Sequence, residues 1–259
     1  MKPVAIFAAT RWELRALHRA FPTFQVSTIA DLRCLVGEQA GQSYWLIQTG
    51  VGPESAGRVA KSIMNRQSIR AVVSAGFACA LEPAQVGDLI VGTESLTARR
   101  RGDWEMQDDV VQCDRALRER TASAAQQAGL AVRGGRFVSV ETVVWQAEDK
   151  RRLSRLSGAV ALDMESAALG AAASRQGVPF AIVRTVSDLV DEDLPVDFNH
   201  FLRPVGWLNG IQALLAHPSS LLGLNRLRKQ SCTAAERLTE VFARYAAAGV
   251  AAGEVGALS

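Results

Sequence analysis

The segment from Ala159 to Asp188 decides the fold. It reads Ala-Val-Ala-Leu-Asp-Met-Glu-Ser-Ala-Ala-Leu at 159–169 and Gly-Val-Pro-Phe-Ala-Ile-Val-Arg-Thr-Val-Ser-Asp at 177–188. Its apolar runs at 159–162 and 180–186 are too short for helices and predict buried strands. Between them, Ser166–Arg175 is rich in Ala and Leu, and the Gly-Val-Pro that follows is a helix stop signal. The segment therefore predicts a strand–helix–strand unit.

Three acids follow the two predicted strands directly: Asp163, Glu165 and Asp188. The carboxyl ends of strands are where open parallel sheets bind ligands. Asp163 and Glu165 are two residues apart, so in extended backbone both point to one side with Met164 opposite. Alternatively, Asp163 caps the helix that starts at Ser166. Glu165 is the better ligand candidate, because a carboxylate can accept hydrogen bonds from two vicinal sugar hydroxyls.

Asp188 has two interpretations. It is either the N-cap of a following turn or a general acid. For the second role we expect apolar neighbours to raise its pKa, so that it can protonate a leaving group.

The rest of the chain alternates between strand and helix patterns. Strands are expected at 4–9, 44–47, 71–75, 86–91 and 134–144, and helices at 12–21, from Pro53 onward and at 115–129. We expect an irregular segment at 96–112 and a helical tail from Pro204, broken at His217-Pro218. This order predicts an α/β fold, a single three-layer domain with a twisted, mixed, mostly parallel sheet flanked by helices. The domain spans 1–245, and 246–259 is expected to fray.

Composition limits the partners and the compartment. The chain has 259 residues, 48% hydrophobic, and a net charge of +3, so it can bury a large core and no nucleic acid partner is required. Four cysteines without metal-type spacing predict reduced thiols and no metal site. The apolar run at 4–9 is too short for a signal peptide or a membrane span. We therefore expect a cytoplasmic protein.

Two further motifs follow predicted strands. The turn Gly50-Val51-Gly52-Pro53 is either a tight turn into a helix or a set of backbone N–H groups for an anion or a ribose oxygen. Glu13 lies at the start of a helix, where an acid often only complements the helix dipole, but it could also orient a water. If most of the strands run parallel, these loops and the three acids converge on one pocket.

Four motifs together resemble the purine nucleoside phosphorylase and nucleosidase superfamily. They are Ala-Ala-Thr-Arg-Trp-Glu at 8–13, Thr-Gly-Val-Gly-Pro at 49–53, Gly-Phe-Ala-Cys-Ala-Leu-Glu-Pro-Ala-Gln-Val-Gly-Asp-Leu at 76–89, and Asp-Met-Glu-Ser-Ala-Ala at 163–168 with Arg-Thr-Val-Ser-Asp at 184–188. The likeness runs from about Pro3 to Phe201. Within the superfamily, the chain resembles the methylthioadenosine/S-adenosylhomocysteine nucleosidases and, more closely, the hopanoid-associated phosphorylases.

The resemblance implies a reaction and a role for each matching residue. The reaction is cleavage of the N-glycosidic bond of a purine nucleoside, expected to be an adenosine modified at its 5′ position. No cofactor is needed except inorganic phosphate as a possible co-substrate. Asp188 would protonate the leaving base and Glu13 would activate water, as the catalytic residues. The expected substrate-binding residues are Glu165 on the ribose hydroxyls, Met164 under the sugar, Val143 and Val144 at the base, and Gly50, Gly52, Phe77 and Ala78 on the sugar and anion side.

Several alternatives stay open at this point. Glu13 favours water as the nucleophile, while the two-helix tail favours phosphate, for which Arg11, Arg15 and Arg184 are the candidate ligands. Between the two, we favour phosphorolysis. Phe77 and Cys79 stand where the superfamily has small residues, and they motivate the alternative of a non-catalytic nucleoside-binding protein.

The helical tail carries a further set of alternatives. Its apolar residues either cover an apolar 5′ group, such as a hopane tail, or pack on the sheet or on a second subunit, the interpretation that we favour. A homo-oligomer is expected. The tail residues in question are Leu208, Ile211, Leu214, Leu215, Leu221, Leu222 and Leu224.

Overall fold

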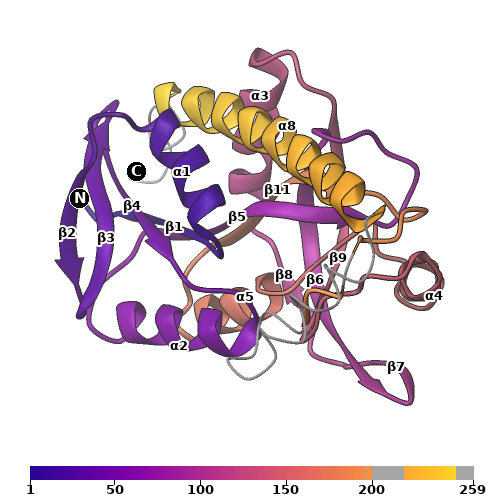
Figure 1. Ribbon diagram of the computed structural model, residues 1–259. Helices are drawn as coiled ribbons and strands as arrows, with labels where there is room; N and C mark the ends of the chain where they lie inside the picture. Colours follow the sequence, from indigo (N-terminus) through magenta and orange to yellow (C-terminus); the bar gives the residue numbers. More distant parts are fainter. Residues whose placement is uncertain (196, 200–218, 249–259) are drawn as a thin grey trace.

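The computed structural model describes residues 1–195, 197–199 and 219–248 (Figure 1). Its strands are β1 (Val4–Ala8), β2 (Gln25–Ile29), β3 (Leu32–Gln39), β4 (Gln42–Gln48), β5 (Ala71–Ala80), β6 (Leu89–Arg101), β7 (Asp103–Met106), β8 (Val111–Gln112), β9 (Val132–Val140), β10 (Ala161–Asp163) and β11 (Phe180–Asp188). Its helices are α1 (Arg11–Ala20), α2 (Pro53–Met64), α3 (Arg115–Gln127), α4 (Ala147–Ser157), α5 (Ser166–Arg175) and α8 (Ser219–Ala247).

The strands form one mixed sheet. Their order is β10-β9-β6-β11-β5-β1-β4-β3-β2, and β7 and β8 pair with β6. β1 lies parallel to both β4 and β5, and β11 lies parallel to β5. β10 pairs with β5 as well as with β9, so β5, β11, β6, β9 and β10 form a closed circuit of strands. The predicted fold class, an α/β domain with helices around a twisted mixed sheet, is confirmed.

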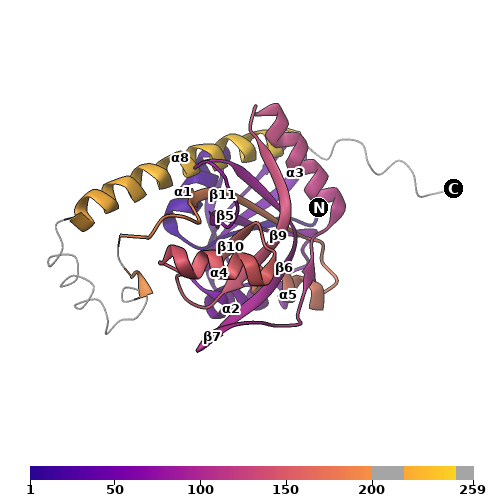
Figure 2. The ribbon, with the colours of Figure 1, turned by 90° about the vertical axis from the view of Figure 1, so that its right-hand side faces the viewer.

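Helices cover both faces of the sheet. α1, α3 and α8 lie on one face and α2 and α5 on the other (Figure 1). Figure 2 shows α8 as one long helix along its face of the domain. Two large apolar clusters fill the spaces between the layers, one under α1 and α8 and one under α2 and α5. The burial of these clusters is the main stabilising contribution to such a fold.

Local sequence signals explain the helix ends. Thr10 caps α1 in a capping box with Glu13, and Asp114 caps α3 by accepting from the Leu117 N–H. Pro53 is the first residue of α2, as predicted. α5 has the predicted bounds, Ser166–Arg175.

Several predicted strand ends are wrong; the strand predicted at 134–144, for example, ends at Val140. β5 does not stop at Ala75 but runs to Ala80, because Gly76–Cys79 pair with β11. The segment 96–112 is not irregular: β6 continues to Arg101, and its end pairs with β7. The elements β2, β3 and α4 were not predicted at all.

The two strands of the central unit meet β5 from opposite directions. β11 runs parallel to β5 and ends with Asp188 beside Cys79, whereas β10 runs antiparallel to β5 and places Leu162 beside the same residue. The two strands that carry these acids therefore run in opposite directions within the sheet. The acids converge because β5 is long enough to pair with both strands near Cys79.

None of the described helices is both long and apolar enough to cross a bilayer. Ala246, near the end of α8, is fully buried. The predicted helix from Pro204 to the break at His217-Pro218, and residues 249–259 of the predicted frayed end, lie outside the described residues.

Candidate active site

One pocket brings together most of the residues singled out in the sequence. Its volume is about 220 Å³. It is lined by Ala9, Thr10, Glu13, Val51, Phe77, Ala78, Cys79, Val143, Val144, Leu162, Asp163, Met164, Glu165, Ser187, Asp188 and Leu194. Gly50 and Gly52 do not line it. Gly52 acts on the pocket indirectly: its N–H donates to Glu165 Oε1 at 2.8 Å, and Glu165 lines the pocket.

Glu13 is buried and its carboxylate is held from two sides. The backbone N–H and the hydroxyl of Thr10 donate to Oε2 at 2.7 and 2.8 Å. The Phe77 N–H donates to Oε1 at 2.8 Å. The capping box of α1 and the strand β5 thus fix this acid in the pocket wall.

Glu165 is the N-cap residue of α5 and is 5% exposed. Burial raises its pKa to about 8, against the opposing effect of Arg184 and with a further rise from Asp163 and Glu13. Such a carboxyl can take up or release a proton near neutral pH. Met164 lies beside it in the same pocket wall.

Arg184 belongs to β11 and its side chain lies among the buried acids, with an exposed fraction of 1%. It donates to Asp163 Oδ2 through Nε at 3.1 Å and Nη2 at 2.8 Å, and to Ser74 Oγ at 2.9 Å. It also lies 3.8 Å from Glu13 and 3.6 Å from Glu165. Its charge compensates three buried carboxyl groups, which would otherwise be costly to desolvate.

Asp163 is mainly structural. The Ser139 hydroxyl donates to its Oδ1 at 2.6 Å, and the Ser166 N–H donates to the same atom at 3.3 Å. The Ser166 hydroxyl donates to Oδ2, next to Arg184. The alternative that Asp163 is the cap of α5 is wrong, because Glu165 is the N-cap residue. Asp163 still accepts from the Ser166 N–H in the first turn of the helix.

Asp188 has polar neighbours rather than only the apolar ones expected from the sequence. The Ser187 hydroxyl donates to Oδ1 at 2.9 Å and the Lys150 ammonium donates to Oδ2 at 2.8 Å. The side chain is 14% exposed and lines the pocket, whereas that of Lys150 is fully buried. Burial lowers the pKa of Lys150, but Asp188 and Cys79 more than offset this and hold it above its usual value. Burial and Asp188 raise the pKa of the Cys79 thiol well above its usual value.

Val143 and Val144 belong to the apolar part of the pocket wall. The backbone of Val143 was expected to contact a base directly, but Asn199 occupies both of its polar groups. The Val143 N–H donates to Asn199 Oδ1 at 2.8 Å, and Asn199 Nδ2 donates to the Val143 carbonyl at 2.9 Å. At Val143, the side chain therefore remains as the available contact surface.

The Gly-Phe-Ala-Cys segment packs tightly against the buried acids. A Cβ added at Gly76 would overlap Glu13 Oε1 and lie 2.5 Å from Arg184 Nη1. Only glycine therefore allows β5 to pass these side chains. Phe77 and Cys79, the bulky departures from small residues, both line the pocket.

Two of the candidate phosphate ligands lie elsewhere. Arg11 and Arg15 line a separate groove of about 480 Å³ between α1 and the β2–β3 pair, together with Arg33. Arg184 is committed to Asp163 and its neighbours. Among the described residues that line the 220 Å³ pocket there is no arginine or lysine.

Three important contacts were missed in the sequence. Thr10 could have been found, since Thr followed three residues later by Glu is a capping-box signature. Lys150 and Asn199 carry no local signal, because their partners lie 38 and 56 residues away in the chain.

A mixed sheet flanked by helices, with four acids around one small pocket, defines an enzyme-like site for a small polar ligand. The chain belongs to the phosphorylase superfamily, whose family model matches residues 3–205. This match confirms the superfamily and, with it, the enzyme type expected from the sequence, a nucleoside phosphorylase or nucleosidase.

Curated relatives and solved structures agree with this assignment. The chain is 24% identical to a 5′-methylthioadenosine/S-adenosylhomocysteine nucleosidase of Shewanella oneidensis, over 82% of this chain and 94% of the relative. A nucleosidase of the same name from Neisseria meningitidis, solved with methylthio-immucillin-A, has a TM-score of 0.73, 23% identity and coverage of 96% and 100% of the two chains. A mutant futalosine hydrolase of Helicobacter pylori has a TM-score of 0.70, 17% identity and coverage of 93% and 98%.

Proposed function

We propose that this protein hydrolyses the N-glycosidic bond of a purine nucleoside, an adenosine modified at its 5′ position. The observation that carries the proposal is the meeting of Glu13, Glu165 and Asp188 in one pocket with an apolar wall. The names of the relatives support the same substrate class.

Each acid has a role in the proposed reaction. Glu165 accepts hydrogen bonds from the ribose hydroxyls, with Met164 against the sugar. As the C–N bond breaks, its electron pair moves into the purine, and Asp188 gives its proton to N7 of the base. Water adds to the anomeric carbon and loses a proton to Glu13. An ionised carboxyl group beside the sugar stabilises the positive charge that develops there in the transition state, and Glu165, with a pKa of about 8, can ionise near neutral pH.

Water is the proposed nucleophile because the pocket offers little for phosphate. Phosphate sites commonly use arginine or lysine side chains. The described residues of the pocket wall include neither, and Arg184 is already paired with Asp163. This favours hydrolysis over phosphorolysis.

A nucleoside panel tests the proposal. Adenosine, 5′-methylthioadenosine and an adenosine with an apolar 5′ chain are assayed for free base with and without phosphate. We expect base release in phosphate-free buffer that added phosphate does not increase. Release that requires phosphate would overturn the choice of water. Binding without turnover would instead favour the non-catalytic alternative that Phe77 and Cys79 motivate.

Replacing the proposed acid gives the matching mutational test. Asp188→Asn keeps the shape of the side chain but removes its acidic proton, so we expect kcat to fall about 10²–10⁴-fold with a smaller change in KM. Asp191→Asn is the matched control, because Asp191 is an exposed acid three residues further on that pairs with Arg151. Equal activity of the two variants would contradict the role of Asp188.

A further inference from the structure

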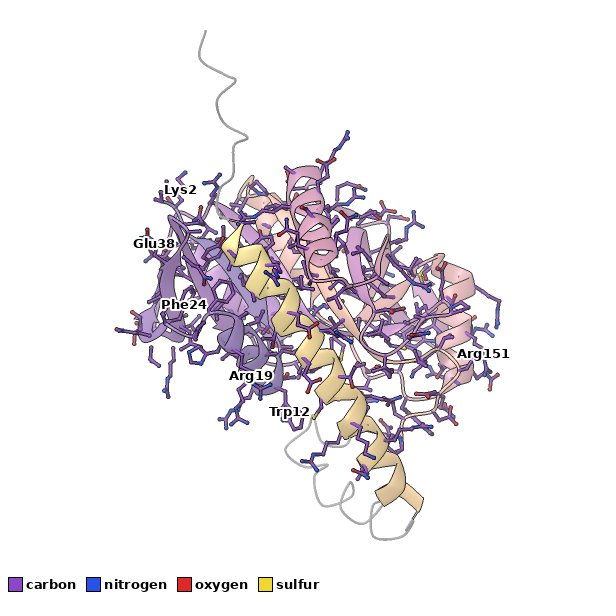
Figure 3. The ribbon with its side chains drawn as sticks, turned by 90° about the horizontal axis from the view of Figure 1, so that it is seen from above. Lys2, Trp12, Arg19, Phe24, Glu38 and Arg151 are labelled. Carbon is purple, nitrogen blue, oxygen red and sulfur yellow. The ribbon has the colours of Figure 1, made fainter. Side chains whose placement is uncertain are left out.

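Lys150 is a buried cation without a role in the chemistry described so far. It lies on α4 and its side chain is fully buried. Its neighbour Arg151 points outward at the edge of the molecule (Figure 3) and pairs with the exposed Asp191. A buried lysine is costly unless its charge and all of its N–H donors are satisfied.

The surroundings of Lys150 provide a hydrogen-bond acceptor for each N–H group of its ammonium. Its ammonium donates to Asp188 Oδ2 at 2.8 Å, to the Glu192 carbonyl at 2.9 Å and to the Leu189 carbonyl at 3.2 Å. These three acceptors match the three N–H groups of an ammonium. One acceptor is a pocket carboxylate, and the other two belong to the segment that follows β11.

The same contacts orient Asp188. Lys150 holds Oδ2 while the Ser187 hydroxyl holds Oδ1, so the carboxyl plane is fixed from both sides. Cys79, which pairs with Asp188 in the β5–β11 register, packs against this pair. Asp188 still lines the pocket.

We propose that Lys150 is a positioning residue that acts through Asp188, by aiming its carboxyl group and by stabilising the carboxylate that forms when its proton passes to the base. This inference rests on the proposed function. As the proton passes to the base, negative charge builds up on the Asp188 carboxyl group, and the Lys150 ammonium lies 2.8 Å from its Oδ2. The interaction therefore strengthens along the reaction, which is the condition for lowering the barrier rather than only binding substrate.

The inference is tested with two leaving groups. A purine leaves with help from a proton, whereas the nitrophenolate of p-nitrophenyl β-D-ribofuranoside leaves as a stable anion and needs none. Both substrates use the ribose site at Glu165 and the water at Glu13. Lys150→Met should lower kcat for the purine nucleoside about 10²-fold and leave the nitrophenyl riboside within a few-fold of the wild type. Arg155→Met, an exposed cation on the same helix, is the control and should leave both rates unchanged.

Two more variants keep the test decisive if Lys150→Met folds poorly. Lys150→Arg retains the charge and should recover part of the purine activity. Lys150→Met/Asp188→Asn removes both partners, leaves no unpaired charge, and should be as active as Asp188→Asn alone, because residues that act together are not additive.

The outcomes separate the two proposals. If the wild type is active and the Lys150 variants lose activity on both substrates equally, Lys150 has a structural role and this inference alone is overturned. A double variant much less active than Asp188→Asn would do the same. A wild type that cleaves neither substrate would overturn the proposed function, and this inference with it.

Discussion

At the scale of single residues, Glu165 links stability to pH. Its pKa is about 8 in the folded protein, chiefly because of burial, against an ordinary value of 4.5. Between these two pH values the native state keeps a proton that the unfolded chain has lost. Stability is therefore favoured below about pH 4.5 and lost as pH rises through 8. We expect the effect to be on the order of a few kcal/mol.

Glu165→Gln should remove this pH dependence, since its amide does not titrate. Urea unfolding at pH 5 and pH 9 measures it: the wild type should lose more stability between the two values than the variant. Glu148→Gln, an exposed carboxylate on α4, should behave like the wild type. The prediction is contradicted if wild type and Glu165→Gln change in parallel.

At the scale of elements, the start of α1 couples helix stability to the site. Thr10 caps the helix and also donates twice to Glu13 Oε2. Thr10→Ala removes the hydroxyl, so we expect a loss of about 1 kcal/mol in the free energy of unfolding. Nucleoside hydrolysis should fall as well, because Glu13 loses one of its donors. The shift of the urea midpoint and kcat measure the two effects.

The conservative variant Thr10→Ser is the control for this cap. Serine keeps the hydroxyl and is an equally good N-cap residue, so its stability and activity should stay near the wild type. A loss in Thr10→Ser as large as in Thr10→Ala would show that the methyl group, not the hydrogen bond, is what matters.

Elements with strong local signals could be predicted and those that depend on pairing could not. α5 has its predicted bounds because an Ala-rich run ends at Gly and Pro signals. Gly76 made the end of β5 look like a turn, but pairing with β11 and β10 extends the strand to Ala80. Arg99–Arg101 look like a loop, yet they pair with β7 at the end of β6. Tertiary pairing decided both cases.

The same distinction applies to the site. Glu13, Glu165 and Asp188 could be predicted because each follows a strand and matches a family motif. Their electrostatic partners could not. Nothing around Lys150 in the sequence distinguishes it from the exposed Arg151 and Arg152 that follow it. Arg184 was considered for phosphate, but only the fold shows that Asp163 and Ser74 hold it.

At the scale of the whole molecule, α8 is hydrogen-bonded to both α1 and β11. The Thr239 hydroxyl donates to the Ala16 carbonyl of α1, and the Thr185 hydroxyl of β11 donates to the Ala234 carbonyl, both at 2.9 Å. α1 carries Glu13 and β11 carries Asp188. α8 therefore supports the two elements that hold the proposed catalytic acids.

Phe242→Ala tests this support. Phe242 is fully buried in the cluster under α1 and α8 and packs 5.6 Å from Tyr245, measured between ring centroids. Removing the ring leaves a cavity, so we expect a loss of about 3–5 kcal/mol in the free energy of unfolding by urea. Glu236→Ala, an exposed position on the same helix, should cost less than about 0.5 kcal/mol. A small effect of Phe242→Ala would mean that the sheet holds α1 and β11 in place without α8.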